Sequence, residues 1–409
     1  MARRRVLFVA ENVTLAQVVR LVTLAGALDP DRYDVHFACS EFDSLIFESS
    51  PFTRWPIHTV PRWYVDRAIR SGRRIYDGRI LKRYVREELD LLQQIRPHLV
   101  VGDFRQSLTV SAPVAGVPYA NLINAYWSPN ASRDAFPLPD HPMVRLLGEP
   151  VAARHFRKAL PWVFDHFARP VNALREEYGL PRIGSLPEVL TAGDYTLFPD
   201  VPSLVPTRST PPQHVYLGPV LWAPSVPPPD WWSALDSRQP TVYVTLGSSG
   251  RVDLLPTVVA ALSELPITVL LATAGRSHLP SVGSNFRVAD YLPGDAAARR
   301  SDLVISNGGS STGYQALAEG KPVIGIPYNL DQYLAMQAIE RYGAGVSLRS
   351  GSLTVEQLRA AVALVLSDAR YPESARRLCV ELQAYDASAR FADFVDRVTS
   401  RVVLATRAS

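Results

Sequence analysis

The sequence predicts an α/β protein built from two doubly wound parallel sheets. Strand-like and helical segments alternate in two series, and a proline-rich stretch separates the series. The strand-like segments are continuous apolar runs such as Val6–Ala10, which is typical of parallel strands buried on both faces. A chain of 409 residues is long enough for two domains with separate cores.

The first series occupies the N-terminal part of the chain, where we expect a Rossmann-like domain over residues 1–205. It begins with Val6–Ala10, and helical periodicity follows over Thr14–Leu28. Its further expected strands are residues 33–39, 99–104 and 119–125. Because strands and helices alternate, the sheet should be parallel and covered on both faces.

The amino-acid composition changes after this series. Residues 129–229 are rich in aromatic residues and prolines, and prolines punctuate residues 205–230 most densely. Such composition favours stiff, extended chain. We therefore expect a linker over residues 206–235.

A second series follows the linker and predicts a C-terminal Rossmann-like domain over residues 236–385. Its expected strands are residues 241–247, 266–273, 286–292, 302–306 and 321–327. Helical segments lie between them, and helical pattern continues from Thr354 to about Leu404. We expect residues 386–409 to form a helix that crosses back to the N-terminal domain.

Composition excludes several classes of protein. The formal net charge is +4, and the one dense basic stretch, Arg67–Arg86, is interpreted as a solvated helix face and not as a nucleic-acid surface. Two cysteines far apart exclude a zinc cluster and argue against a disulfide framework. The first apolar run is too short for a signal peptide and meets Glu11 early, and no 18-residue apolar segment exists, so no membrane span is expected. A reducing cytoplasm is the default expectation.

Ligands of doubly wound sheets bind beyond the carboxyl ends of the strands. The loops at Gly247, Leu292–Gly294, Asn307 and Asn329–Gln332 follow predicted strands, so we expect them to meet in one crevice. The motif NGGSST at 307–312 opens a helix, whose exposed N–H groups and dipole favour an anion such as phosphate. An ordinary strand–helix turn with a Ser or Thr N-cap is the alternative, and both stay open at this point. Neither GxGxxG nor GxxxxGK[ST] is present.

The stretch SDLVISNGGSSTGYQALAEGKPVIGIPYNLDQ, residues 301–332, resembles the donor-binding block of family 1 glycosyltransferases of the GT-B fold, in their bacterial natural-product tailoring branch. In that family the pattern runs His-x-Gly, small and hydroxyl residues, Glu, Gly-x-Pro and Asp-Gln. The resemblance covers most of the chain. It implies two Rossmann-like domains facing across a crevice and a hexosyltransferase that uses a UDP- or dTDP-sugar.

The resemblance also implies a set of donor-binding residues. Contacts to the donor phosphates would come from the two hydroxyls after the first strand of the second series and from the helix start: Ser248, Ser249, Gly308, Gly309, Ser310, Ser311 and Thr312. Tyr291 would stack on the base, and the Leu292 backbone would read the base edge. The sugar hydroxyls would be bound from the Asn329 loop by Asp331 and Gln332, although Asp331 has helix N-capping as an alternative role.

Three positions depart from the family pattern, and each replaces an ionisable group by a neutral amide. Asn307 stands where His usually contacts the diphosphate, and Gln315 where Glu usually binds the ribose. Gln17 stands where the catalytic His is usual. An Asn amide can still donate to phosphate, but Gln17 cannot abstract the acceptor proton.

Other residues are therefore considered as the base of an inverting transfer. Asp103 matches the family's supporting acid and could act directly or through a water. Glu11 is a second carboxylate near the crevice, with capping of the helix from Thr14 as the favoured alternative. His141 could supply a base from the acceptor side, although a surface-loop histidine is the plainer interpretation.

The aromatic-rich segment predicts the acceptor. Trp127 and Phe136 would line the acceptor side with other aromatic residues, which favours a small lipophilic or aromatic molecule over a peptide or nucleic acid. The one Asp-x-Asp, at residues 29–31, is interpreted as turn chemistry, so no metal site is expected. The helix N-terminus would stabilise the leaving diphosphate instead, and no cofactor is needed beyond the nucleotide sugar as co-substrate.

The sequence thus predicts an inverting, metal-independent glycosyltransferase that acts on a small lipophilic acceptor. Two alternatives stay open: a catalytically silent GT-B partner protein, which the missing histidine favours, and a non-transferring sugar-nucleotide enzyme such as an epimerase. The donor's base and sugar, the acceptor, the linkage and the oligomeric state, including a homodimer, are not readable from the residues.

Overall fold

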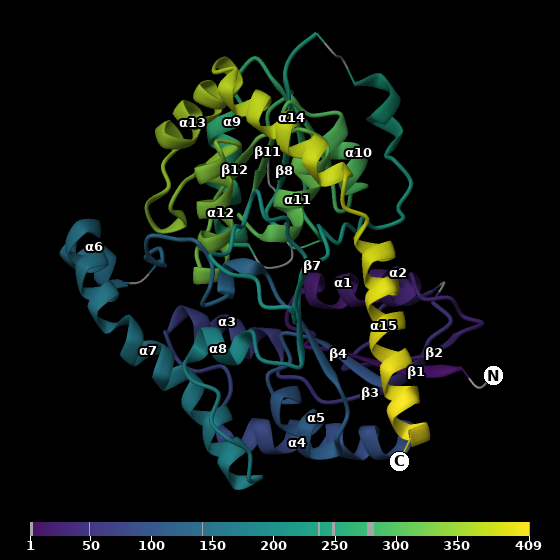
Figure 1. Ribbon diagram of the computed structural model, residues 1–409. Helices are drawn as coiled ribbons and strands as arrows, with labels where there is room; N and C mark the ends of the chain where they lie inside the picture. The colour runs from purple at the N-terminus through teal and green to yellow at the C-terminus, as the bar shows by residue number, and fades with distance from the viewer. Residues whose placement is uncertain are drawn as a thin grey trace. The chain divides into compact units, whose positions relative to one another are not determined.

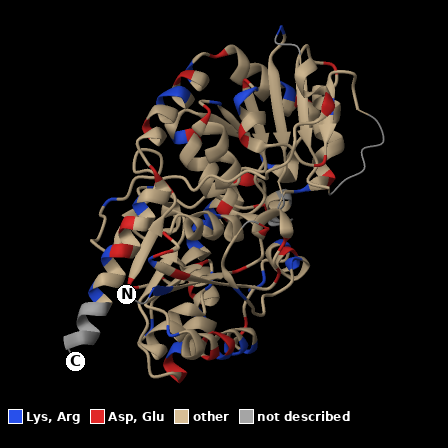
Figure 2. Ribbon diagram, turned by 90° about the vertical axis from the view of Figure 1, so that its right-hand side faces the viewer, with Lys and Arg blue, Asp and Glu red and all other residues tan. Residues whose placement is uncertain are grey.

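The computed structural model describes residues 3–48, 50–140, 142–235, 238–247, 250–275 and 282–408 (Figure 1). The chain divides into two compact units. Unit 1 comprises Met1–Arg133, His155–Trp222 and Tyr385–Ser409, and unit 2 comprises Asp134–Arg154 and Ala223–Ala384. Acidic and basic residues are interspersed on the helices of both units (Figure 2).

Unit 1 contains a parallel sheet of seven strands in the order β3-β2-β1-β4-β5-β6-β7. The strands are β1 Arg4–Ala10, β2 Tyr33–Cys39, β3 Thr53–Pro56, β4 Leu99–Asp103, β5 Tyr119–Leu122, β6 Tyr195–Phe198 and β7 His214–Tyr216. The central strand β1 pairs in parallel with β2 and β4, with Val6 opposite Val35 and Leu99. The apolar runs of the sequence therefore form the buried centre of the sheet.

Helices cover both faces of this sheet. They are α1 Leu15–Gly26, α2 Ser44–Phe47, α3 Arg62–Arg70, α4 Gly78–Ile95, α5 Leu108–Ala115, the part of α7 Glu149–Glu177 that begins at His155, α8 Leu186–Leu190 and α15 Ala387–Ala408. Alternate side chains of β1 point to opposite faces, as the pleat requires. Phe8 packs with α1 and α15, whereas Leu7 packs with α4 and α5.

Unit 2 contains a parallel sheet of six strands in the order β10-β9-β8-β11-β12-β13. The strands are β8 Thr241–Thr245, β9 Thr268–Ala272, β10 Phe286–Ala289, β11 Leu303–Ser306, β12 Val323–Gly325 and β13 Gly345–Ser347. Its helices are α6 Pro142–Leu147, α9 Leu255–Leu262, α10 Gly294–Arg299, α11 Ser310–Ala318, α12 Leu330–Tyr342, α13 Val355–Ser367 and α14 Arg370–Gln383. The predicted fold class, two doubly wound parallel sheets, is confirmed.

The units differ from the predicted domain boundaries at one internal segment, because residues 134–154 group with unit 2. Polar contacts of Asp140 hold this segment there. Tyr333 Oη and Ser350 Oγ donate hydrogen bonds to the Asp140 carboxylate at 2.8 and 2.6 Å, and Arg349 Nη2 lies 3.0 Å from it. A carboxylate bound by three side chains anchors the segment to unit 2, although the segment lies between two stretches of unit 1 in the sequence.

The predicted linker over 206–235 also extends too far, because β7 lies within it and forms an edge strand of unit 1. Among the residues that the structure describes, no helix combines the length and apolarity needed to cross a bilayer. The same residues hold no group of three or more His, Cys, Asp or Glu side chains arranged for a metal ion.

Candidate functional site

The carboxyl ends of the unit 2 strands bring the predicted donor loops together. A methyl group built on Gly247 would lie 3.7 Å from Asn307 Nδ2, and one built on Gly294 would lie 3.1 Å from Gln315 Oε1. Gly308 has a positive φ of 75°, and a methyl group there would lie 2.8 Å from Met336 Cγ of α12. The loops after β8, β10 and β11 and helix α12 therefore lie against one another.

The turn between β11 and α11 is built from neutral polar groups. Ser306 Oγ accepts a hydrogen bond from Gly308 N at 3.0 Å, and Asn307 Oδ1 accepts one from Gly309 N at 3.1 Å. Gly309, which has no side chain to cap the helix, is the N-cap of α11, so the alternative of a Ser or Thr N-cap is wrong. The first-turn hydroxyl residues are half-buried: Ser310, Ser311 and Thr312.

The residues predicted for the base and ribose also lie at this end of the sheet. Tyr291 is 47% exposed, and its hydroxyl donates to Ala274 O at 3.4 Å, whereas the side chain of Leu292 is buried. Gln315 is half-buried beside Gly294. The two predicted phosphate contacts after β8 lie outside the described residues: Ser248 and Ser249.

The start of α12 holds the residues predicted for the sugar. Asn329 is the N-cap of α12 and accepts from Gln332 N at 3.0 Å, so the alternative N-cap role for Asp331 is wrong. Asp331 is half-buried in the first turn. Gln332 is buried, and its Oε1 accepts from Tyr328 N at 3.1 Å. The amide oxygen of Gln332 is therefore used to hold the loop before α12. Its NH₂ group is the part of the side chain that is suited to donate a hydrogen bond to a sugar oxygen.

In unit 1, Gln17 caps the helix that carries it. Its Oε1 accepts hydrogen bonds from Thr14 N at 3.0 Å and Val13 N at 3.2 Å, which completes a capping box at the start of α1. The side chain is buried. The sequence contained this signal, because Thr-x-x-Gln before an apolar helix is a capping-box pattern.

Asp103, the last residue of β4, is fully buried and paired with Arg20. Arg20 Nε and Nη2 each donate to its carboxylate at 2.9 Å, which is a bidentate ion pair. Arg20 Nη1 donates to Asn124 Oδ1 at 2.9 Å, and Asn124 in turn donates to Asp200 at 3.0 Å. Arg20 lies three residues after Gln17 on α1, and the sequence did not single it out. Arg20 is thus the cationic partner of this acid.

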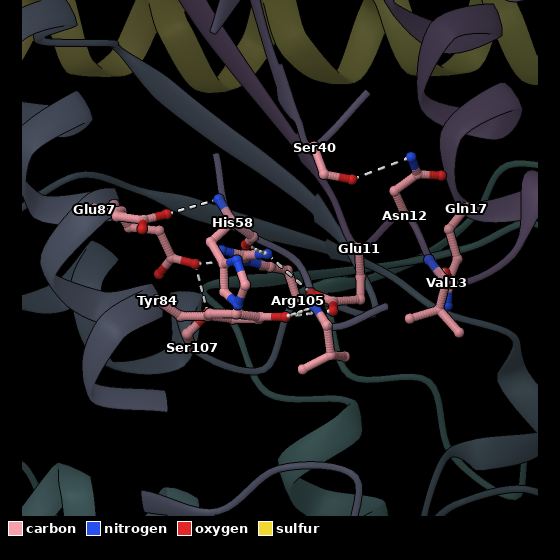
Figure 3. A network of polar contacts seen from close by, with 12 residues as sticks. Glu11, Asn12, Val13, Gln17, Ser40, His58, Tyr84, Glu87, Arg105 and Ser107 are labelled. Carbon is pink, nitrogen blue, oxygen red and sulfur yellow. Dashed lines mark hydrogen bonds and ion pairs between the residues drawn. The ribbon is translucent and has the colours of Figure 1, made fainter. Parts of the chain in front are cut away.

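Glu11 belongs to a second buried network, which Figure 3 shows. Tyr84 Oη donates to Glu11 Oε1 at 2.8 Å, and Arg105 Nη1 donates to Glu11 Oε2 at 3.0 Å. Arg105 Nε also donates to Glu88 at 2.7 Å, and its Cζ lies 3.7 Å from the centre of the Tyr84 ring. Capping of α1 by Glu11 is therefore wrong, because both carboxylate oxygens are bound elsewhere. We name this cluster, Glu11, Tyr84, Glu88 and Arg105, the Arg105 network.

Burial sets the ionisation of the Arg105 network. It raises the pKa of Glu11, against the charge of Arg105 and the hydroxyl of Tyr84, which lower it. Burial alone would lower the pKa of Arg105, but the charges of Glu11 and Glu88 raise it above its ordinary value. The guanidinium therefore stays charged, and the network holds one fixed cation between two carboxyl groups.

His58 lies at the edge of this network and was not singled out in the sequence, because no motif marks it. Its backbone N donates to Glu87 at 2.7 Å, and its backbone O accepts from Arg105 Nη1 at 3.0 Å (Figure 3). The half-buried ring meets Tyr84 edge-on with centroids 5.9 Å apart. Neither ring nitrogen makes a hydrogen bond with a residue that the structure describes. Burial lowers the pKa of His58, the charges of Arg83 and Arg105 act in the same direction, and Glu87 opposes them.

The predicted acceptor residues fall in both units. Trp127 is buried in the 3₁₀ turn Ala125–Trp127 of unit 1, and Phe136 is half-buried in the segment that belongs to unit 2. His141 lies outside the described residues.

Residues 252–393 match the family model described as "Erythromycin biosynthesis protein CIII-like, C-terminal domain". In structure, the chain is similar to the spinosyn forosaminyltransferase SpnP, with a TM-score of 0.71 and 18% identity over 98% of this chain and 100% of that one. It is also similar to the spinosyn rhamnosyltransferase SpnG complexed with thymidine diphosphate, with a TM-score of 0.67 and 21% identity over 96% and 100% of the two chains. These likenesses confirm the GT-B fold.

Sequence relatives are much closer. A "PGL/p-HBAD biosynthesis glycosyltransferase" of Mycobacterium tuberculosis is 52% identical over 92% of this chain and 88% of its own length. A "PGL/p-HBAD biosynthesis rhamnosyltransferase" of Mycobacterium bovis is 50% identical over 92% and 84%. A further Mycobacterium bovis protein, named an inactive glycosyltransferase of the same biosynthesis, is 48% identical over 64% of this chain and 72% of its own length. The chain belongs to the GT-B glycosyltransferase family that includes these PGL/p-HBAD biosynthesis enzymes.

Proposed function

We propose that this glycosyltransferase moves a sugar from a nucleotide-diphosphate sugar to a small lipophilic acceptor through a phenol hydroxyl, with inversion and without a metal ion. The observation that carries the donor half is the start of α11, where a glycine is the N-cap and three hydroxyl residues form the first turn. The names of the 50–52% identical relatives support sugar transfer over a silent or non-transferring role. SpnG, which has the same fold, was solved with thymidine diphosphate.

The diphosphate would bind at the first turn of α11. The backbone N–H groups and the helix dipole favour negative charge there, and the hydroxyls of Ser311 and Thr312 add donors. When the sugar leaves, charge develops on the same diphosphate, so donors that are already positioned lower the barrier. This stabilisation comes from the protein, which is why a metal ion is not required in the proposal.

The acceptor proton needs a base other than the residues first expected. Gln17 cannot take a proton, and its amide oxygen is bound to the start of α1. Asp103 is bidentate with Arg20 and fully buried, which favours a positioning role. Glu11 accepts from both Tyr84 and Arg105.

We assign His58 as the base that takes the proton of the acceptor hydroxyl. Its lowered pKa keeps the imidazole neutral at pH 7, and both ring nitrogens lack a hydrogen bond to any described residue. Its backbone is held on both sides, by Glu87 and Arg105. A phenol suits such a base, because its pKa of about 10 lies far below that of an alkyl alcohol. His58 also follows β3, so it lies at the carboxyl end of the sheet where ligands of doubly wound folds bind.

The proposal is tested with the full chain. A thermal-shift screen with UDP-, dTDP- and GDP-sugars identifies the donor, and transfer to p-hydroxybenzoate esters and to matched alkyl alcohols is then followed by chromatography. We expect transfer to the phenols with inverted anomeric configuration by NMR, unchanged after EDTA treatment. Retained configuration, or transfer that EDTA abolishes and Mg²⁺ restores, would contradict the mechanism. Preference for alkyl alcohols would contradict the acceptor.

A further inference from the structure

Two tryptophans stand on the surface of unit 1. Trp63 on α3 and Trp162 on α7 are each 66% exposed. Exposed apolar side chains rimmed by polar residues can mark a site of protein or membrane interaction, so the neighbours of both indoles bear on their role.

On α3, Trp63 shares its face with two arginines. Arg67 and Arg70 follow it by four and seven residues, which places all three on one side of the helix, and all three are exposed. The opposite side buries Val65 and Ala68. The exposed face of α3 thus carries one indole followed by two guanidinium groups.

The outer face of α7 repeats this pattern. Lys158, Trp162, His166 and Arg169 recur every three or four residues, and the rings of Trp162 and His166 stack with centroids 5.4 Å apart. The inner face of α7 is buried in the same apolar cluster as α3, through Ala168 and Val171.

The loop after α3 joins the two faces. Ile75, in this loop, packs against the same apolar cluster as Val65 of α3 and Ala168 of α7. We name the surface formed by Trp63, Arg67, Arg70, Arg73, Arg74, Lys158, Trp162 and Arg169 the tryptophan–arginine face.

Positive charge is concentrated in the stretch of sequence that contains α3 and the loop after it. Residues 62–86 contain nine basic and two acidic residues, whereas the whole chain has a formal charge of only +4, so the rest of the chain is net acidic. None of the basic side chains of the tryptophan–arginine face forms an ion pair with a residue that the structure describes. The acidic residues of the same segments are Asp66, which lies 4.0 Å from Arg62, Asp77, which caps α4, and Asp165 on α7.

We propose that the tryptophan–arginine face docks on a membrane surface rich in anionic phospholipid. Indoles prefer the boundary between headgroups and acyl chains, and each Lys or Arg near an anionic bilayer adds attraction. Single-stranded nucleic acid also binds basic and aromatic side chains, but along a groove, whereas these indoles stand on the outward surfaces of helices. This role is independent of the sugar-transfer proposal and would bring the enzyme to a lipophilic acceptor held in a membrane.

The test is sedimentation of the full chain with vesicles of phosphatidylcholine alone or of phosphatidylcholine and phosphatidylglycerol at 3:1. We expect binding to the mixed vesicles only, and its loss at high salt. Arg67→Glu/Arg70→Glu should weaken binding at least tenfold, since each basic residue contributes about fivefold near such a surface. Trp63→Ala/Trp162→Ala should weaken it by a similar factor.

Matched controls lie elsewhere on the surface. Arg397→Glu changes an exposed arginine of α15, and Val380→Ala removes an apolar side chain of α14 that is 68% exposed. Both should bind vesicles like the native chain. Thermal unfolding and transfer to a soluble phenol show that the variants are folded, and these readouts separate failure of docking from failure of catalysis. The proposal is overturned if folded face variants bind mixed vesicles as tightly as the native chain, or if a single-stranded oligonucleotide binds more tightly than the vesicles.

Discussion

The carboxyl ends of the two sheets are built from different chemistry. In unit 1, the ends of β1 and β4 carry buried charges that pair with opposite charges, as in the Arg20–Asp103 pair and the Arg105 network. In unit 2, the loops after β8, β10, β11 and β12 carry amides, hydroxyls and glycines, and of the described donor candidates only Asp331 is charged. Several of these side chains are half-buried or exposed, including Tyr291, Gln315 and Thr312.

This difference separates residues that support the structure, in unit 1, from residues suited to binding a ligand, in unit 2. Charges buried in pairs hold loops in place, but an ion pair already formed offers a substrate little. Neutral donors around a helix start can be exchanged between water and a diphosphate without a large desolvation cost. A charged residue at a family's catalytic position is therefore weak grounds for a chemical role until its partners are known, as Asp103 shows.

The largest expected effect comes from removing the imidazole of His58, whose ring nitrogens make no hydrogen bond with a described residue. His58→Gln should lower kcat by about 10²–10⁴, the usual value of general-base help, with the smaller loss for the more acidic phenols. In the native enzyme, kcat/KM should fall on the acid side with an apparent pKa below 6.5, because protonation removes the base and burial lowers the pKa of His58. The variant should lose that acid limb in a pH–rate profile.

His155→Gln is the matched control for this prediction, because His155 is an exposed histidine of α7. It should keep both the rate and the acid limb. If His58→Gln transfers sugar at the native rate while Asp103→Asn abolishes the acid limb, the base is Asp103 and the separation of support from binding fails in unit 1.

The second prediction concerns the stability of unit 1. Arg105→Met should lower the free energy of unfolding by about 3–5 kcal/mol, because it leaves Glu11 and Glu88 buried without their cation. Arg83→Met, which breaks an exposed pair with Glu87, should cost at most about 1 kcal/mol. Urea unfolding followed by circular dichroism measures both. Equal small losses would mean that water reaches the Arg105 network and that it is not a buried support.

Patterns local in sequence predicted much of the fold. The central strands were readable because a parallel strand buried on both faces is continuously apolar, as in β1 and β11. Helix α7 was not, because Pro161 and Pro170 interrupt its 29 residues and aromatic side chains obscure its periodicity. The short edge strand β7, with three residues, carries too little pattern to be recognised.

The candidate site also has parts that could be predicted from adjacent residues and parts that could not. The start of α11 was predicted because its glycines and hydroxyls are adjacent in the chain. The ion pairs of unit 1 were not, because Arg20 and Asp103 are separated by 83 residues, and Glu11 and Arg105 by 94. A residue's partner in a doubly wound fold is set by strand order, and the order β3-β2-β1-β4 cannot be read from local patterns.

The third prediction sharpens the description of unit 2. Ser311→Val/Thr312→Val should weaken donor binding by roughly 1–3 kcal/mol, because two hydrogen bonds to the diphosphate are lost and each contributes about 0.5–1.5 kcal/mol. Ser367→Val, at the far end of α13, is a matched control that should not change affinity. Calorimetry with UDP and dTDP measures the change. Unchanged affinity in the double variant would remove the diphosphate from the start of α11.

The prediction with the smallest expected effect tests whether neutral groups control donor binding in unit 2. Asn307 does not titrate, so affinity for an intact nucleotide sugar should be nearly flat from about pH 6 to 8 in the native enzyme. In Asn307→His, the imidazole gains a proton as pH falls through about 6.5 and then donates a charge-assisted hydrogen bond. Affinity in this variant should therefore rise by about 1 kcal/mol, or about fivefold, from pH 8 to pH 6. Asn307→Ala, which also loses the bond from Gly309 N, is the control and should stay flat at a lower affinity. Calorimetric titration at constant ionic strength decides the matter: a tenfold pH dependence in the native enzyme would mean that an ionisable group controls the donor site, and the contrast between the two sheets would not hold.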